Sequence, residues 1–326
     1  MLLKKVLLAS AVAASMLLAG GVAQAQGGGK LLIGSTSASS SQYGYFVSLA
    51  KLINDQVPGV EASVVETGAT VDNLRRIARD QIDLGLVTTN VGQHAYAGER
   101  DFKGRPIDNR LLWVYSVAPQ NVVVRADAGV DSLAGLEGKR FNPGIRGSAT
   151  EQTTEAVLEA LGISPDLVRG STTDVVDMIK DNRLVGYAKS GVGSKLDASS
   201  LDISTLTPVK VLSLTGEQAE ILRKGSPDIS VIEIPAGAAD GVPAYTTWSF
   251  GLAVHASPGM DEETAYRITK AAMEDTTVQA NALADLKGVD LTELTMENGT
   301  VPLHPGAARY FREKGVEIPD AIRPKS

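Results

Sequence analysis

Short apolar runs alternate along the chain with stretches whose apolar residues recur every three or four positions. Residues 31–33 form the first run, and residues 46–53 follow it with the spacing of an amphipathic helix. Two further apolar runs, at residues 62–65 and 82–87, also lead into polar loops, and a helical stretch at residues 70–78 lies between them. This alternation predicts an α/β fold in which a mainly parallel sheet carries helices on its faces.

A second unit of the same design begins after extended stretches at residues 111–117 and 121–125. Its strand, polar loop and helix are predicted at residues 139–141, 142–150 and 153–161. The later elements are strands at residues 184–189, 209–214 and 246–254, and helices at residues 217–222, 261–273 and 305–315. A length of 326 residues agrees with two folded units rather than one.

The polar loops of the first unit follow strands, and open α/β sheets bind ligands beyond the carboxyl ends of their strands. The first loop, residues 34–43, consists mostly of small hydroxyl residues and leads into a helix N-terminus, which favours negative charge. Thr70 is expected to cap the helix after the second loop. The same residue types also suit turns and helix caps that bind nothing. The candidate ligand-binding residues of this unit are Ser35, Thr36, Tyr43, Thr67, Gly68, Ala69, Thr88, Thr89 and Asn90.

The polar loop of the second unit also lies at a predicted helix N-terminus, and it adds a cation, Arg146. A second cation, Lys189, ends the strand predicted at residues 184–189. An arginine has the planar fork that binds a carboxylate through two hydrogen bonds, so Arg146 is the preferred partner for an anion. A solvent-facing position is the alternative for both cations. The candidate residues of this unit are Arg146, Gly147, Ser148, Ala149, Thr150 and Lys189.

The N-terminal residues 1–25 have the pattern of a cleaved secretory signal peptide. A pair of lysines precedes an apolar run at residues 6–18, and Ala23-Gln24-Ala25 supplies the small residues of a cleavage site. We therefore expect a freely soluble periplasmic protein, since no later segment is apolar enough to predict a membrane span. The chain contains no cysteine, which excludes disulfides and a thiol-linked lipid anchor.

The charge and the histidines exclude several classes of function. Net charge is −7, and it becomes −9 once the two lysines of residues 1–25 are removed, whereas a nucleic-acid binder needs a basic surface. His94, His255 and His304 are widely spaced, and the chain has neither a Gly-x-Ser-x-Gly elbow nor a dense metal-ligand cluster. We expect no enzyme, no metal and no bound cofactor; a periplasmic hydrolase is the enzymatic alternative.

Short motifs in a fixed order cover nearly all of the chain after the signal peptide. They are Ile33-Gly34-Ser35 with Tyr43, Pro58-Gly59-Val60, Glu66-Thr67-Gly68-Ala69 with Asn73-Leu74-Arg75, Asp83-Leu84-Gly85-Leu86-Val87, Val124-Arg125-Ala126-Asp127, Leu136-Glu137-Gly138-Lys139-Arg140, Gly147-Ser148-Ala149-Thr150 and Leu303-His304-Pro305-Gly306-Ala307. In this ordered set the chain resembles the TAXI family, the solute-binding proteins of tripartite ATP-independent periplasmic (TRAP) transporters. It departs from the family in the serines of the first loop, in residues 142–150 and around Lys189.

The resemblance implies two α/β lobes of the type II-like periplasmic-binding-protein kind, joined by two extended hinge crossings within the stretches at residues 121–125 and 246–254. The first lobe would comprise residues 26–122 and 247–326, and the second lobe residues 123–246. Closure of the lobes would bury a ligand between them and present a closed shape to a permease.

The resemblance also implies a small anionic ligand, of the glutamate or 2-oxoglutarate type, delivered by a monomer to a TRAP permease. One carboxylate is expected on Ser35, Thr36 and the helix N-terminus, with Tyr43 against the carbon chain. Arg146 or Lys189 would pair with the second carboxylate. A module that presents bound solute to a membrane sensor kinase needs the same two lobes, so it stays an alternative.

Overall fold

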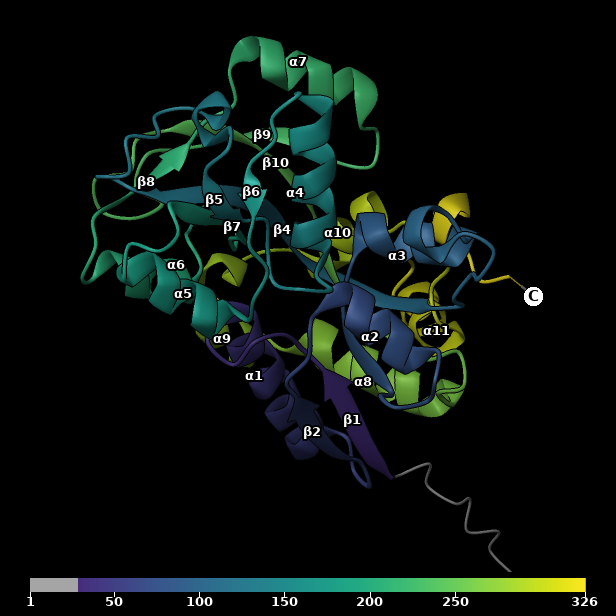
Figure 1. Ribbon diagram of the computed structural model, residues 1–326. Coiled ribbons are helices and arrows are strands. Elements are labelled where there is room, and N and C mark those ends of the chain that lie inside the picture. Colours follow the sequence, from purple (N-terminus) through teal and green to yellow (C-terminus); the bar gives the residue numbers. More distant parts are fainter. Residues whose placement is uncertain (1–28, 326) are drawn as a thin grey trace, which may run out of the picture.

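Two long strands, β4 (Arg110–Arg125) and β10 (Tyr245–Ala256), run antiparallel to each other through the centre of the protein. The structure is a computed structural model that describes residues 29–325, so the expected signal peptide lies outside the described residues. Nearly every residue of both strands is buried, because each strand contributes to the cores of two lobes. Figure 1 shows these lobes one above the other, with α1 and β1 below and α4 to α7 above.

The first lobe contains a parallel set of strands in the order β2-β1-β3, beside which β10 runs antiparallel. These strands are β1 (Lys30–Gly34), β2 (Glu61–Val65) and β3 (Leu84–Thr88). The helices that follow them are α1 (Ser41–Gln56), α2 (Thr70–Ile77) and α3 (Thr89–Ala97). The end of the chain returns to this lobe as α8 (Glu262–Glu274), α9 (Val278–Ala282), α10 (Leu291–Asn298) and α11 (Pro305–Glu313).

The second lobe repeats the design around the other half of β4. Its parallel strands are β5 (Arg140–Asn142), β6 (Asp166–Leu167) and β7 (Gly186–Ser190), while β8 (Val209–Leu212) pairs with β4 and β9 (Ser230–Ile234) with β10. Its helices are α4 (Ala149–Ala160), α5 (Thr172–Lys180), α6 (Ala198–Ser204) and α7 (Gly216–Gly225). Short 3-10 turns are η1 (Arg100–Phe102), η2 (Leu133–Leu136), η3 (Ala284–Leu286) and η4 (Asp320–Ile322).

Side-chain alternation along β4 explains why the second lobe has two cores. Val122 and Val124 pack into one cluster with α4 and α7, whereas Val123 between them packs on the opposite face of the sheet with α5 and α6. Successive strand residues point to opposite faces, so three adjacent valines can serve both cores. The first lobe has one large core, in which the stacked rings of Tyr45 and Tyr115 lie 4.2 Å apart.

The predicted α/β class, with two lobes and two crossing strands, is confirmed. The two extended stretches predicted at residues 111–117 and 121–125 are one continuous strand, since Pro119 lies within β4 without ending it. The central pair of strands is antiparallel, so the sheet is mixed rather than parallel throughout. The predicted lobe boundaries, after residues 122 and 246, fall inside β4 and β10 and stay a prediction.

Two helix starts differ from the prediction because of how backbone amides are capped. Helix α4 begins at Ala149 rather than at residue 153, because the Ser148 hydroxyl accepts the Glu151 amide and starts the helix earlier. Thr70 does not cap α2 but is its first residue, and its hydroxyl accepts the Thr88 amide instead. Within residues 29–325, no helix combines the length and the apolar character needed to cross a bilayer.

Candidate functional site

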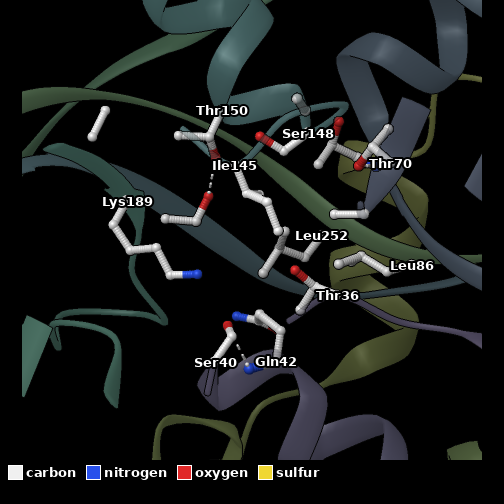
Figure 2. A pocket seen from close by; sticks show the side chains of 15 residues that line it. Thr36, Ser40, Gln42, Thr70, Leu86, Ile145, Ser148, Thr150, Lys189 and Leu252 are labelled. Carbon is white, nitrogen blue, oxygen red and sulfur yellow. Dashed lines mark hydrogen bonds between the residues drawn. The ribbon is translucent and has the colours of Figure 1, made fainter. Parts of the chain in front are cut away.

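A small cavity lies between the lobes at the carboxyl ends of β1, β3 and β7. Its volume is about 40 Å³, enough for roughly three water molecules, so the side chains that line it must shift to admit an organic ligand. Polar groups of both lobes face it, and Figure 2 shows them converging from opposite sides. The lining residues are Thr36, Ser40, Gln42, Ala69, Thr70, Leu86, Thr88, Ile145, Ser148, Ala149, Thr150, Ala188, Lys189, Ser190 and Leu252.

The cavity unites seven of the residues proposed from the sequence. They are Thr36, Ala69 and Thr88 of the first lobe and Ser148, Ala149, Thr150 and Lys189 of the second. Each lies where a strand passes into a helix or where a strand ends, which is the position that the strand–loop–helix pattern predicts for ligand contacts. The edge of each sheet that the sequence predicted for ligand contacts is therefore the edge at which this cavity lies.

Gln42 is the most informative lining residue that sequence reasoning missed. Its Oε1 atom accepts a hydrogen bond from the Tyr115 hydroxyl at 2.7 Å, while its buried Nε2 atom has no partner among residues 29–325. Burial raises the pKa of Tyr115, which keeps the phenol protonated as a donor. This contact fixes the amide so that Nε2 is a free donor facing the cavity (Figure 2). The prediction chose Tyr43, one residue along the same helix, which lies outside the cavity lining.

Lys189 is the cation of the cavity. It lies on β7, its side chain is 11% exposed, and its ammonium points to the cavity centre opposite the Gln42 amide (Figure 2). Its Nζ atom is 3.7 Å from Oδ1 of the buried Asp197, so part of its charge is balanced within the protein. Beside it, the hydroxyls of Thr150 and Ser190 are 2.8 Å apart, and Ser190 donates to Gln120. The cavity thus combines one ammonium with several neutral hydrogen-bond donors.

Arg146, the cation preferred from the sequence, lies on the outer surface and does not line the cavity. Its loop contacts the first lobe through backbone atoms, and Arg146 also lines a separate, open hollow with Glu66, Thr67 and Gly68. The carbonyl oxygen of Gly147 accepts the Val71 amide at 2.8 Å, and the carbonyl oxygen of Arg146 lies against Gly68. Arg146, Gly147 and Gly68 therefore form an interlobe backbone contact, and of the two predicted cations only Lys189 lines this cavity.

The other candidates outside the cavity lining form internal hydrogen bonds. Thr67 Oγ1 donates to the Ser35 carbonyl at 2.7 Å, and Thr89 Oγ1 accepts the Gly251 amide at 3.0 Å. The buried Ser35 hydroxyl has no partner within residues 29–325, but it does not line the cavity. Asn90 donates from Nδ2 to Thr153 Oγ1 at 3.2 Å and so links α3 to α4 across the cleft. These hydrogen bonds join separate elements of the fold, so they are neither the ligand contacts nor the local turn and cap contacts that the sequence suggested.

The three histidines lie in separate environments. His255 bonds to Asn109, His304 caps α11 and contacts the Met260 carbonyl, and His94 is 3.3 Å from Asp228. Burial lowers the pKa of His94, although the Asp228 carboxylate acts in the opposite direction. No described group of three or more His, Cys, Asp or Glu side chains is placed to hold a metal ion.

Comparison with known proteins gives a family and a fold. A model of the NMT1-like family matches residues 33–315. A putative L-cystine ABC transporter protein from Listeria monocytogenes is similar at 12% identity and a TM-score of 0.51, covering 80% of this chain and 97% of that one. The ligand-binding component of an ABC-type import system from Staphylococcus aureus, with zinc bound, is similar at 11% identity and a TM-score of 0.50, covering 90% and 96%. Both likenesses show the two-lobe fold of these proteins.

Proposed function

The chain belongs to the NMT1-like family, and on that premise we propose that it is a periplasmic solute-binding protein. It captures a small organic carboxylate between its lobes and delivers it to a membrane permease. The proposal rests above all on one observation: the Lys189 ammonium faces the Gln42 Nε2 atom, which has no partner among residues 29–325, in an interlobe cavity. Both groups donate hydrogen bonds, and the oxygens of a carboxylate only accept them.

The cavity supports an anion with a short carbon chain. Leu86, Leu252 and Ile145 give it apolar walls, and hydroxyls of both lobes supply neutral donors. Burial strengthens the attraction between an ammonium and a carboxylate because water is excluded. One carboxylate of a glutamate-like or 2-oxoglutarate-like ligand would bind Lys189 and Gln42. Its second carboxylate would meet the hydroxyls of Thr36, Ser148 and Thr150, since Arg146 is outside.

The partner that receives the solute is proposed from the ordered sequence motifs. Motifs such as residues 303–307 resemble those of TAXI proteins and favour a TRAP permease, which uses no ATP. The two structural matches share only the fold, and their names belong to ABC-type systems. Uptake by membrane vesicles containing the cognate permease distinguishes the two: TRAP transport continues without ATP, and ABC transport stops. A membrane sensor kinase that responds to the loaded protein is the remaining alternative.

We propose no catalysis, because the three histidines are not arranged as a nucleophile–base pair with any neighbouring serine among the described residues. His94 and His304 have pKa values lowered by burial, and each is held by a structural contact. Turnover of a bound carboxylate by purified protein would contradict this part of the proposal.

A thermal-shift screen followed by calorimetry tests the binding function. Glutamate, 2-oxoglutarate, succinate and short monocarboxylates are each added to the mature chain, and a ligand that binds only the folded state raises the melting temperature. Lys189→Gln should weaken binding of the active compound by about tenfold to a hundredfold. Lys180→Gln is the matched control, since Lys180 pairs with Asp202 and is not among the residues that line the cavity. Equal affinities of the two variants would exclude Lys189 from the site.

A further inference from the structure

The carboxylate of Asp197 is fully buried between the lobes, although it belongs to the second lobe alone. Asp197 caps α6, and its Oδ2 atom accepts hydrogen bonds from Ser40 Oγ and from the Ser41 amide, both at 2.9 Å, at the start of α1 in the first lobe. In return, Ser41 Oγ accepts the Ala198 amide at 2.9 Å. The first turns of α1 and α6 thus each receive an oxygen from the other lobe.

A negative charge is what allows these two helix starts to meet. The unpaired amides at a helix N-terminus carry partial positive charge, so α1 and α6 would repel each other if they met directly. Asp197 lies between them, and Lys189 Nζ, 3.7 Å from Oδ1, adds a third positive group. A buried carboxylate is stable only with such partners, and Asp197 has partners on both sides of the cleft.

This contact occupies the place where the sequence predicted the ligand. The serine-rich loop and the N-terminus of α1 were expected to bind the carboxylate of a solute. In the structure they bind the protein's own carboxylate, and Asp197 itself does not line the cavity. Lys189 is shared, since it contacts Asp197 and also faces the cavity.

We propose that Asp197 is a positioning residue that latches the lobes closed and holds Lys189 at the cavity wall. When the lobes separate, Asp197 loses Ser40 and Ser41 and keeps only its own-lobe partners, Ser199 and Lys189. The latch therefore favours the closed state before any ligand arrives. This inference goes beyond the proposed function, because it concerns the ligand-free protein.

The absence of cysteine from the chain allows a direct test. Spin labels are attached to Val47→Cys of the first lobe and Leu206→Cys of the second, which are both exposed positions. Pulsed electron paramagnetic resonance then reports the distribution of distances between the lobes. Without ligand, Asp197→Asn should shift the distribution to longer distances. Asp202→Asn removes the same charge from the exposed face of α6 and should leave the distribution unchanged. Superimposable distributions for these two variants would overturn the proposal.

Ser41→Ala is a milder variant that tests the same interlobe contact if Asp197→Asn does not fold. Ser41→Ala removes only the acceptor for Ala198 and keeps the Ser40 cap, so a smaller shift in the same direction is expected. If Asp197→Asn does not fold and Ser41→Ala leaves the distribution unchanged, the proposal fails.

Ligand affinity gives a second readout that a merely structural role would not move. For any carboxylate that binds the wild type, Asp197→Asn should weaken apparent affinity about tenfold to a hundredfold, because less of the free protein is closed. At saturation the interlobe distance should match that of the wild type. A different saturated distance, or unchanged affinity, contradicts the latch. If none of the tested carboxylates binds, the proposed function fails, while the ligand-free distances still decide on Asp197.

Discussion

The Gly147 carbonyl oxygen accepts a hydrogen bond from the Val71 amide at 2.8 Å, across the cleft between the lobes. Val71 lies in the first turn of α2, which has no side-chain cap of its own. The second lobe therefore satisfies a backbone donor that the first lobe leaves open. The two polar loops in which the sequence predicted ligand contacts thus meet each other through backbone atoms.

The close approach of these loops makes Gly68 sensitive to substitution. A Cβ atom at residue 68 would lie 2.7 Å from the Arg146 carbonyl oxygen, closer than packed atoms allow. Gly68→Ala should push the lobes apart and destabilise the protein by about 1–3 kcal/mol, as overpacking does. Small-angle scattering and urea unfolding measure both effects. The control is Gly44→Ala, whose added methyl meets no atom within 4 Å; equal behaviour of the two variants would show that the loops are not in tight contact.

Gln42 offers a test of the sign of the ligand's charge. Gln42→Glu replaces the free donor by a carboxylate opposite Lys189, so an anionic ligand meets repulsion. We expect carboxylate affinity to fall by about a hundredfold or more, measured by calorimetry. Gln81→Glu, an identical change at an exposed position, should have no effect. Tighter binding of a carboxylate to Gln42→Glu would contradict the orientation proposed here.

Tyr45 is a hydrogen-bonding centre of the first-lobe core. Its hydroxyl donates to Gln279 Oε1 at 2.7 Å and accepts from Trp113 Nε1 at 3.2 Å, so it joins α1, α9 and β4. Tyr45→Phe leaves both partners buried without their bond and should lower the free energy of unfolding by about 1–3 kcal/mol. Urea denaturation measures the loss. Tyr96→Phe, at a partly exposed position, should cost much less.

His255 predicts how stability depends on pH. Asn109 Nδ2 donates to two carbonyls, so its Oδ1 atom accepts from His255 Nδ1, which leaves the buried Nε2 atom unprotonated. Burial lowers the pKa of His255 from 6.5 to about 3. Below pH 6.5 the unfolded chain therefore binds a proton at His255 that the native state does not bind. The free energy of unfolding falls for this reason by about 1.4 kcal/mol per pH unit until pH 3 is approached.

The measurement compares unfolding free energies of the wild type and His255→Gln between pH 7 and pH 4. The wild type should lose stability more steeply as the pH falls, because the variant lacks this group. Carboxylates titrate in both proteins and cancel in the difference. Parallel curves would mean that His255 takes up its proton in the folded state.

Local patterns predicted the sheet edge but not the direction of side chains on it. Thr36, Thr88 and Ser148 were found because a strand followed by a hydroxyl residue marks a ligand-binding edge. Gln42 and Tyr43 are neighbours in sequence, yet only Gln42 faces the cavity, since adjacent helix residues point about 100° apart. The start of α1 therefore had to be known to within one residue.

Contacts between the lobes were beyond reach of the sequence for a different reason. Asp197 contacts Ser40 across 157 positions of the chain. Gly147 contacts Val71 through backbone atoms, which are the same in every residue type and so leave no pattern in the sequence. Arg146 was preferred over Lys189 on the chemistry of its side chain alone. Which of the two faces inward is decided by the contact of the loop backbone with the first lobe, which no local pattern encodes.

The crossing of the lobes by paired strands limits how the protein can move. β4 and β10 pair as strands from Ser249 to Ala256, on the first-lobe side of the crossing. Beyond that segment the Thr247 hydroxyl donates to the Gln120 carbonyl and the Tyr245 hydroxyl donates to Asn121 Oδ1, so side-chain hydrogen bonds tie the two crossings into one ribbon rather than two slack linkers. Opening that keeps these contacts bends the ribbon as a unit, so few new backbone conformations become accessible. The backbone gains little conformational entropy when the cleft opens and loses little when it closes. Closure around a solute therefore carries only a small entropic penalty.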